Sequence, residues 1–135
     1  MQTAAMAVTT PAVAAAFADA IVARDIAAAT ALLHPEVDFR AMTPNRIWEG
    51  GPAGAEEALR RWLEDPEEEV HGVEATEPVT VAGTQRVGWR VRVSDAEGMH
   101  VFEQQAYVRE RDGKVGWMRL MCSGYNELPE DDAAA

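Results

Sequence analysis

Apolar residues recur at helical spacing in two segments of the chain, one near its start and one between residues 52 and 63. The repeating positions are Val13, Phe17 and Ile21 in the first segment, and Ala55, Leu59 and Trp62 in the second. Each segment begins at a proline, which suits the first turn of a helix because an N–H there would have no partner in any case. The pattern predicts one helix in each segment, the second ending at Asp65-Pro66.

The stretch between these helices changes from helical to extended periodicity. Asp25 can cap a short helix, which we expect to run to Leu33 because Pro35 disfavours helical geometry in the residue before it. Apolar and charged residues then alternate over residues 37–41, which is typical of a strand. Residues 43–51, TPNRIWEGG, are rich in turn formers and are expected to form a loop.

From residue 68 onward the apolar positions recur every second residue, which indicates β-strands. The expected strands cover residues 68–82, 85–94, 99–110 and 114–123. Short turns separate them, so each strand should run antiparallel to the next. Three helices followed by this meander predict an α+β fold, with the three N-terminal helices packed on a strongly bent antiparallel sheet.

The pairing of the second and third of these strands can be predicted from their two faces. The second strand points Val87, Trp89, Val91 and Val93 to one side and Arg86, Arg90 and Arg92 to the other. Pairing Val93 with His100 sets Trp89 opposite Gln104. A slip of one residue would instead bury Glu103 under the helices without a partner, which is costly. We therefore expect the first register, with Gln104 facing the helices and Glu103 facing outward.

Length, charge and cysteine content set the limits of the interpretation. A chain of 135 residues, 47% of them hydrophobic, favours one domain, expected over residues 10–127, between disordered segments at 1–9 and 128–135. The net charge of −11 repels phosphate groups and anionic lipids, so neither nucleic acid nor a membrane is expected as a partner. Cys122 is the single cysteine, which excludes an internal disulfide and suggests a reducing, cytoplasmic location.

Three stretches of the sequence resemble a known family: ARDIAAATALLHPEVDF, IWEGGPAGAEEALRRWL and VRERDGKVGWMRLMCSGY. Together with the order of elements, they resemble the SnoaL-like group of the nuclear transport factor 2-like superfamily. The resemblance covers residues 11 to 125 and implies a bent sheet that wraps helices into a cone with an internal cavity. The superfamily includes ketosteroid isomerases, polyketide cyclases, epoxide hydrolases, dehydratases and binding modules, so the fold does not select one activity.

The resemblance and the strand register together predict which side chains surround the cavity. The expected wall residues are Phe17, Ile21, Phe39, Trp48, Trp62, Trp89, Phe102, Met118 and Leu120. We expect this cavity to bind a small, mostly apolar molecule, oriented by Gln104 together with other polar groups. Those groups are His100, Asn45 and Tyr125. Alternatively, Gln104 bonds a neighbouring side chain or a buried water and never meets a ligand.

The acids and bases of the superfamily's catalytic branches have no match in this sequence. The positions that correspond to those of ketosteroid isomerases hold Ala41, Phe17 and Ala106, and the acid of SnoaL-type cyclases corresponds to Leu120. No catalytic residue is therefore predicted. Neither a cofactor nor a metal is expected, because the three histidines lack close ligand spacing. The alternative, a cofactor-independent isomerase, cyclase or hydrolase for a polyketide- or terpenoid-like substrate, would need an acid such as Asp38, Glu103 or Glu110.

The outer face of the sheet should carry apolar side chains within a charged surround. Its apolar members are Val101, Tyr107, Trp117 and Met121, and its polar members are Arg90, Arg92, Glu103, Gln105 and Arg119. An apolar centre with a charged rim is typical of an interface, so we expect a homodimer through this face. A purely structural homodimer with a filled cone is the third interpretation of the function.

Overall fold

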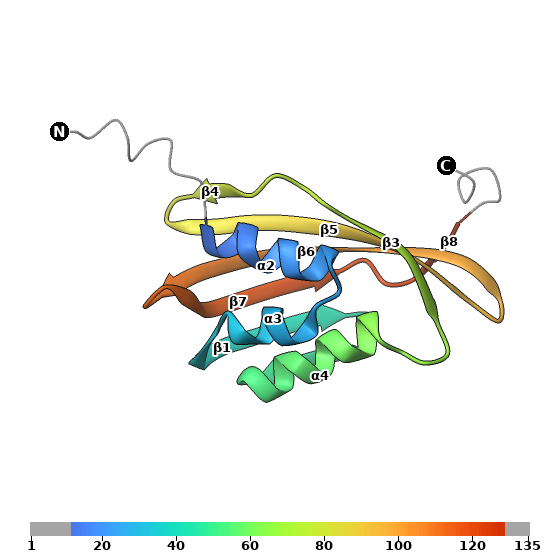
Figure 1. The fold of residues 1–135 in the computed structure, drawn as a ribbon, viewed down its shortest axis with the longest axis horizontal. Helices are drawn as coiled ribbons and strands as arrows, with labels where there is room; N and C mark the ends of the chain where they lie inside the picture. Colours follow the sequence, from blue (N-terminus) through green and yellow to red (C-terminus); the bar gives the residue numbers. More distant parts are fainter. Residues whose placement is uncertain (1–11, 129–135) are drawn as a thin grey trace.

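The computed structural model describes residues 12–128, which form an α+β fold (Figure 1). In this range, three helices lie on one face of a curled sheet of eight strands. The predicted helix start at Pro11, the predicted disordered residues 1–9 and all but the first residue of the predicted disordered tail, 128–135, lie outside the described residues. Within the described range, no helix is long and apolar enough to cross a membrane.

The helices begin and end close to where the sequence pattern predicts. They are α2 (Ala12–Val22), α3 (Ile26–Ala31) and α4 (Pro52–Leu63). Asp25 caps α3 as expected, since its side chain accepts a hydrogen bond of 2.9 Å from a backbone N–H of the first turn. The helix ends before the expected Leu33, because Leu33 already starts a strand and the Leu32 carbonyl accepts a hydrogen bond from the N–H of Val115.

The sheet is mixed rather than purely antiparallel. Its strands are β1 (Leu33–Thr43), β2 (Arg46–Gly50), β3 (Glu69–Ala75), β4 (Val79–Val81), β5 (Thr84–Asp95), β6 (Gly98–Arg111), β7 (Lys114–Cys122) and β8 (Asn126–Glu127). The order is β2-β1-β7-β6-β5-β3, with β4 beside β5 and β8 beside β6. Strand β1 runs parallel to β7, and the other described pairs are antiparallel. No short turn joins β1 to β7, so their direction could not be predicted from hairpin geometry.

The expected loop 43–51 instead contains a tight turn and strand β2, which forms a hairpin with β1. Thr43 pairs with Arg46 across a two-residue turn, Pro44-Asn45, and Asn45 has φ +69°. Proline followed by a residue with positive φ matches a type II turn, in which asparagine is tolerated at the second position. Trp48 therefore lies on a strand, and its side chain is buried on the inner face of the sheet.

The predicted strand 68–82 is also divided into two. Strands β3 and β4 both pair with β5, but residues 76–78 leave the ladder between them. Thr76 bonds to Gly88 instead: its hydroxyl oxygen accepts a hydrogen bond of 2.9 Å from the Gly88 N–H. Pro78 has no N–H to donate to a ladder, which explains the break.

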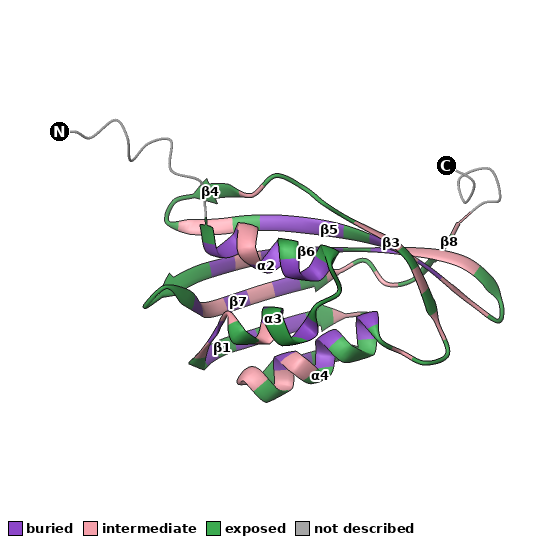
Figure 2. Ribbon diagram, in the orientation of Figure 1, coloured by how far each residue is buried: buried purple, intermediate pink, exposed green. Residues whose placement is uncertain are grey.

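The predicted register between β5 and β6 is confirmed, and it directs the inner face of the sheet toward the helices. The observed partners include Val93 and His100, Trp89 and Gln104, and Arg90 and Glu103. Buried residues recur at every second position in the middle of β6, and the buried residues of β5 and β7 are interspersed with partly or fully exposed ones (Figure 2). The largest fully buried side chains are Phe17, Phe102, Ile21, Leu59 and Met118. The core therefore lies between the helices and the inner face of the curled sheet.

Candidate functional site

A cleft of about 320 Å³ opens where the β1–β2 turn, α4, β6 and the β7–β8 loop meet. Its lining residues are Thr43, Pro44, Arg46, Trp48, Arg61, Trp62, Phe102, Cys122, Gly124 and Tyr125. A site of this size lies at the small end of the range for pockets that hold organic ligands. The cleft forms the mouth of the cone, and side chains of the core close it from behind.

Two aromatic pairs form the apolar walls of this cleft. Trp48 on β2 meets Trp62 on α4 edge-on, with ring centroids 5.8 Å apart. Phe102 on β6 meets Tyr125 in the same manner at 5.3 Å. The indole N–H of Trp48 also donates a hydrogen bond of 3.0 Å to the hydroxyl of Thr43. Edge-to-face contacts stabilise aromatic pairs beyond their burial, so these rings are held in place by the protein itself.

A close backbone approach joins the two loops of the cleft. Gly124 has φ +82°, and a Cβ atom at this position would lie 2.6 Å from Cγ of Pro44. Glycine adopts such a φ without strain and has no Cβ to clash. It therefore lets the β7–β8 loop pack against the β1–β2 turn, and this contact positions the neighbouring Tyr125 at the cleft.

A tyrosine–carboxyl pair lies at the rim of the cleft. The Tyr125 hydroxyl donates a hydrogen bond of 2.8 Å to Oε1 of Glu68. Burial raises the pKa of Tyr125 well above its ordinary value, and the hydrogen bond to Glu68 raises it further. Burial also raises the pKa of Glu68, although the hydrogen bond from Tyr125 opposes this shift and the nearby Asp65 adds to it. The apolar cleft thus has one carboxyl group at its edge that resists ionisation.

The raised pKa of Glu68 predicts that Glu68→Gln stabilises the protein in a pH-dependent way. Below the ordinary glutamate pKa, Glu68 is neutral in both the folded and the unfolded chain. As the pH rises through the folded-state pKa, wild-type Glu68 must ionise in a partly desolvated place, and stability is lost. Glutamine still accepts the Tyr125 hydrogen bond but does not ionise. We therefore expect the unfolding free energy of Glu68→Gln, relative to wild type, to increase from pH 4 to pH 7.

Urea denaturation at both pH values measures this difference. Glu67→Gln, at an exposed neighbouring position, is the control and should show a smaller change with pH. A stability difference for Glu68→Gln that is the same at both pH values would contradict the prediction.

Four predicted ligand-binding residues line the cleft, and most of the others fill the core. Trp48, Trp62, Phe102 and Tyr125 are the four at the cleft. The others that face inward as expected, but are buried without lining it, are Phe17, Ile21, Phe39, Trp89, Met118 and Leu120. They pack against one another, as in the contact of the Phe17 and Trp89 rings at 5.9 Å. The cone is therefore filled at depth and open at its mouth.

Two polar candidates lie near the cleft without lining it. His100 is close to the rim, with its ring centroid 6.3 Å from that of Tyr125 and its Nδ1 atom 3.8 Å from Oδ1 of Asp95. Asn45 is exposed in the β1–β2 turn. Its role there is conformational, because it supplies the positive φ that the turn requires.

Gln104 is buried on the inner face, where the register predicts it, and its side-chain oxygen bonds a neighbour. Oε1 accepts a hydrogen bond of 2.8 Å from the indole N–H of Trp89, which is the alternative left open for this residue. Within residues 12–128, the Nε2 atom has no hydrogen-bond partner. Gln104 lies beside Phe102 along β6 and opposite Cys122 on β7, so it is one position behind the cleft wall.

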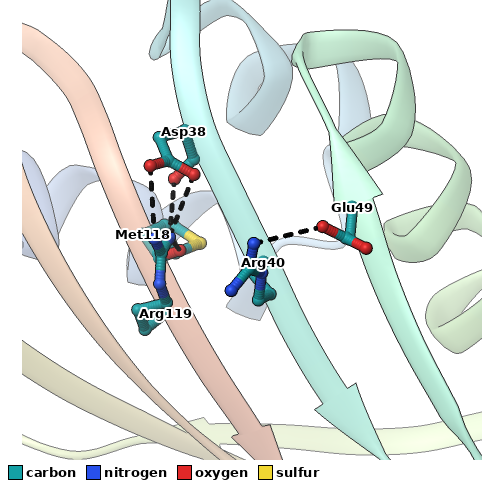
Figure 3. Close-up of polar contacts among 5 residues, drawn as sticks. All are labelled: Asp38, Arg40, Glu49, Met118 and Arg119. Atoms are coloured by element: carbon teal, nitrogen blue, oxygen red, sulfur yellow. Dashed lines mark hydrogen bonds and ion pairs between the residues drawn. The ribbon is translucent and has the colours of Figure 1, made fainter.

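Two of the carboxylates that a catalytic alternative would need, those of Asp38 and Glu103, lie on the outer face of the sheet. Asp38 is paired with Arg119, with Nη2 and Oδ2 3.2 Å apart (Figure 3). The hydrogen bond from Arg119 lowers the pKa of Asp38, which keeps this carboxylate ionised. Glu103 is paired with Arg90, with Oε2 and Nη2 2.7 Å apart, and Glu110 is exposed. None of these three acids is among the described residues that line the cleft.

Three charged residues near the cleft were not among the sequence predictions: Arg46, Arg61 and Glu68. Arg61 precedes the buried Trp62 on α4, and this adjacency is the signal that could have placed it near the cone mouth. Glu68 belongs to an acidic run that is most simply explained as a solvated surface. Its partner Tyr125 comes from the far end of the chain, so no local pattern connects the two.

No family model and no curated protein matches the sequence, whereas solved structures share its fold. An NTF2-like protein of unknown function from Cytophaga hutchinsonii is similar with a TM-score of 0.61 and 14% identity, over 84% of this chain and 99% of that chain. A proposed SnoaL-like polyketide cyclase from Mesorhizobium loti is similar with a TM-score of 0.62 and 16% identity, over 81% of this chain and 95% of that chain. A hypothetical protein with a ketosteroid isomerase-like fold from Catenulispora acidiphila was solved in complex with trimethylamine. It is similar with a TM-score of 0.63 and 15% identity, over 93% of this chain and 92% of that chain.

The chain has a nuclear transport factor 2-like fold. The resemblance inferred from the sequence is thus confirmed at the level of the fold. Identities of 14–16% establish this shared architecture and no particular activity. In the nuclear transport factor 2-like fold of this chain, the cleft lies at the mouth of the cone, and the interior behind it is occupied by the protein's own side chains.

Proposed function

We propose that the protein binds a small, mostly apolar molecule in the cleft at the mouth of the cone. The observation that carries this proposal is the pair of aromatic walls, Trp48 with Trp62 and Phe102 with Tyr125, around a volume of about 320 Å³. Rings that are held rigidly lose little entropy on binding and present an apolar surface to a ligand. Such walls favour an apolar ligand body.

The filled interior supports a small ligand. Behind the cleft, Phe17, Trp89 and Met118 are almost completely buried. A ligand can therefore occupy only the mouth of the cone. A molecule that reached beyond the cleft would have to displace these core side chains, which is costly in a close-packed interior. The ligand therefore has a short chain or a small ring system and enters from the rim beside Tyr125.

Substituting Tyr125 tests this proposal, because the residue is 43% exposed and can be removed with little damage to the core. We expect Tyr125→Ala to weaken the binding of a neutral apolar probe, octanamide, by about tenfold, since part of one aromatic wall is lost. Titration followed by tryptophan fluorescence measures the affinity. Tyr107→Ala, on the outer face of the sheet, is the matched control and should bind like wild type. If the two variants bind octanamide with equal affinity, the cleft is not the binding site.

A second candidate function is supported by the carboxyl group at the rim. Glu68 has a raised pKa and adjoins an apolar cleft, which is the environment of many general acids and bases. A cofactor-independent isomerase, cyclase or hydrolase acting on a polyketide- or terpenoid-like substrate could use it to move a proton. Exchange of the protons beside the carbonyl of 2-tetralone in D₂O, followed by NMR, tests this function. Exchange that is not accelerated by the protein, or is equally fast with Glu68→Gln, would contradict it.

We also propose that two copies associate through the outer face of the sheet. Met121 is 55% exposed there, and Val101, Tyr107 and Trp117 are partly exposed beside it. Two guanidinium groups flank the Trp117 ring. The Cζ atom of Arg109 lies 4.1 Å from the ring centroid, and that of Arg119 lies 4.7 Å from it. An aromatic residue among arginines has the composition of an interface core, which supports a two-fold dimer.

If the protein is a dimer, its sedimentation coefficient at tens of micromolar should be that of two associated copies. This concentration is roughly ten times above the ~1 μM dissociation constant expected for a modest interface. Met121→Glu should shift the protein to monomers, because it places a charge in the apolar centre. Val22→Glu, an exposed apolar residue on α2, is the control and should remain dimeric. A wild-type protein that sediments as a monomer at this concentration would rule out the dimer.

A further inference from the structure

Among the described residues, the charged side chains that line the cleft are two arginines, Arg46 on β2 and Arg61 on α4. The chain as a whole is acidic, with 12 basic and 23 acidic residues. A cleft with cationic lining therefore differs from the average surface of this protein. Guanidinium groups present a planar fork of N–H donors that matches a carboxylate, and they also tolerate contact with aromatic rings.

Aromatic walls could instead favour an ammonium ligand, but the contacts in the cleft oppose that alternative. The Cζ atom of Arg46 lies 3.3 Å from the ring centroid of Trp48, so a guanidinium already covers this ring. A second cation would meet like charge at the same place. The carboxylates near the rim are engaged as well, since Glu68 accepts a hydrogen bond and Asp65 pairs with Arg61 at 2.6 Å.

Both guanidinium groups retain donors for a ligand. Arg61 uses Nη1 for its contact with Asp65, and Arg46 lies 3.8 Å from Glu57, which is longer than a charge-assisted hydrogen bond. Each arginine has five N–H groups, and each side chain here is 52% exposed. The nearby acids and the net charge of −11 disfavour a doubly charged group such as phosphate, whereas a carboxylate brings one charge only.

We propose that the ligand of the cleft is an amphipathic carboxylate. Its short apolar body lies between the aromatic walls, and its carboxylate binds the guanidinium groups of Arg46 and Arg61. This inference rests on the proposed function and adds the charge of the ligand to it. The arginines would then determine which apolar molecules the protein selects.

Three probes with the same chain and different ends test the inference: octanoate, octanamide and octylammonium. Tryptophan fluorescence titrations at pH 7.5 and low salt give the three dissociation constants. We expect octanoate to bind about tenfold more tightly than octanamide, and octylammonium to bind most weakly. The preference for octanoate should decrease as salt is added, because the arginines are partly exposed.

Substitutions identify the groups responsible for this preference. Arg46→Gln and Arg61→Gln should each reduce the octanoate preference severalfold and leave octanamide binding nearly unchanged. Arg60→Gln is the matched control, because Arg60 neighbours Arg61 on α4, is equally exposed and pairs with Glu56 and Glu64 away from the cleft. This control should keep the full preference. Thermal unfolding of each variant shows whether it remains folded.

The outcomes separate the inference from the proposed function. Equal binding of octanoate and octanamide, or tighter binding of octylammonium, would overturn the carboxylate inference and leave the apolar cleft intact as a binding site. A preference for octanoate that survives in both cleft arginine variants would also overturn it, since the carboxylate would then bind elsewhere. If none of the three probes binds, the proposed function fails and the inference fails with it.

Discussion

Replacing Gly54 by alanine is expected to destabilise the protein by about 2 kcal/mol. A Cβ atom at this position would lie 2.3 Å from the backbone oxygen of Glu49, closer than such atoms approach in folded proteins. The clash is with backbone and cannot be relieved by a side-chain rotation, so it should cost about 3 kcal/mol, at the upper end for overpacking. The better helix propensity of alanine offsets about 1 kcal/mol of this cost.

The same substitution should also disturb the cleft. Gly54 lies in the first turns of α4, and its close approach to the end of β2 sets the distance between the two elements that carry Trp62 and Trp48. Gly51→Ala is the control, because a Cβ atom there meets nothing within 4 Å and its φ is −82°. Urea denaturation should place Gly51→Ala within about 0.5 kcal/mol of wild type. Equal stabilities of the two variants would contradict the close packing of α4 against β2.

Replacing Gln104 by leucine is expected to cost about 1–3 kcal/mol of stability. The substitution keeps the approximate volume but leaves the indole N–H of Trp89 buried without the acceptor that now lies 2.8 Å away. Trp89→Phe should be destabilising as well, because it leaves the Gln104 oxygen without its donor and removes part of a buried ring. Octanamide affinity should be nearly unchanged in Gln104→Leu, since Gln104 lies behind the cleft wall.

The double variant separates the hydrogen bond from the loss of packing. When both partners become apolar, neither is left with an unsatisfied polar group, so the cost should be smaller than the sum of the single costs by about 1 kcal/mol. Urea denaturation of the wild type, the two single variants and the double variant completes this cycle. Strict additivity would show that the Gln104 and Trp89 side chains contribute independently, contrary to their arrangement in the core.

The sheet register could be predicted from the sequence because each wrong register has a large physical cost. A slip of one residue would have buried Glu103 and exposed Phe102, so the pairing of β5 with β6 was decided by side-chain burial. The α3 cap could be predicted for a similar reason, since Asp25 satisfies a backbone N–H within its own first turn. These features depend on residues that are close in sequence or joined by a short turn.

The cleft could be predicted only in part, because it depends on contacts between distant segments. Alternation correctly predicts that Phe39 and Met118 face inward, but it does not reveal whether inward side chains leave space or fill it. Trp48 was expected to be a wall residue carried by a loop, and it lines the cleft from strand β2 instead. The pairing of Glu68 with Tyr125 joins residues 57 positions apart, and no local pattern indicates it.

The location of a bound apolar molecule tests the central claim most directly. The chain has four tryptophans: Trp48 and Trp62 at the cleft, Trp89 in the core and Trp117 on the outer face. Their indole N–H groups give four signals in a ¹H–¹⁵N correlation spectrum, which Trp→Phe variants assign. Titration with octanamide up to its solubility limit should shift the Trp48 and Trp62 signals in a saturable manner and leave Trp117 in place. Four unchanged signals, or a saturable shift of Trp117 alone, would contradict binding in the cleft.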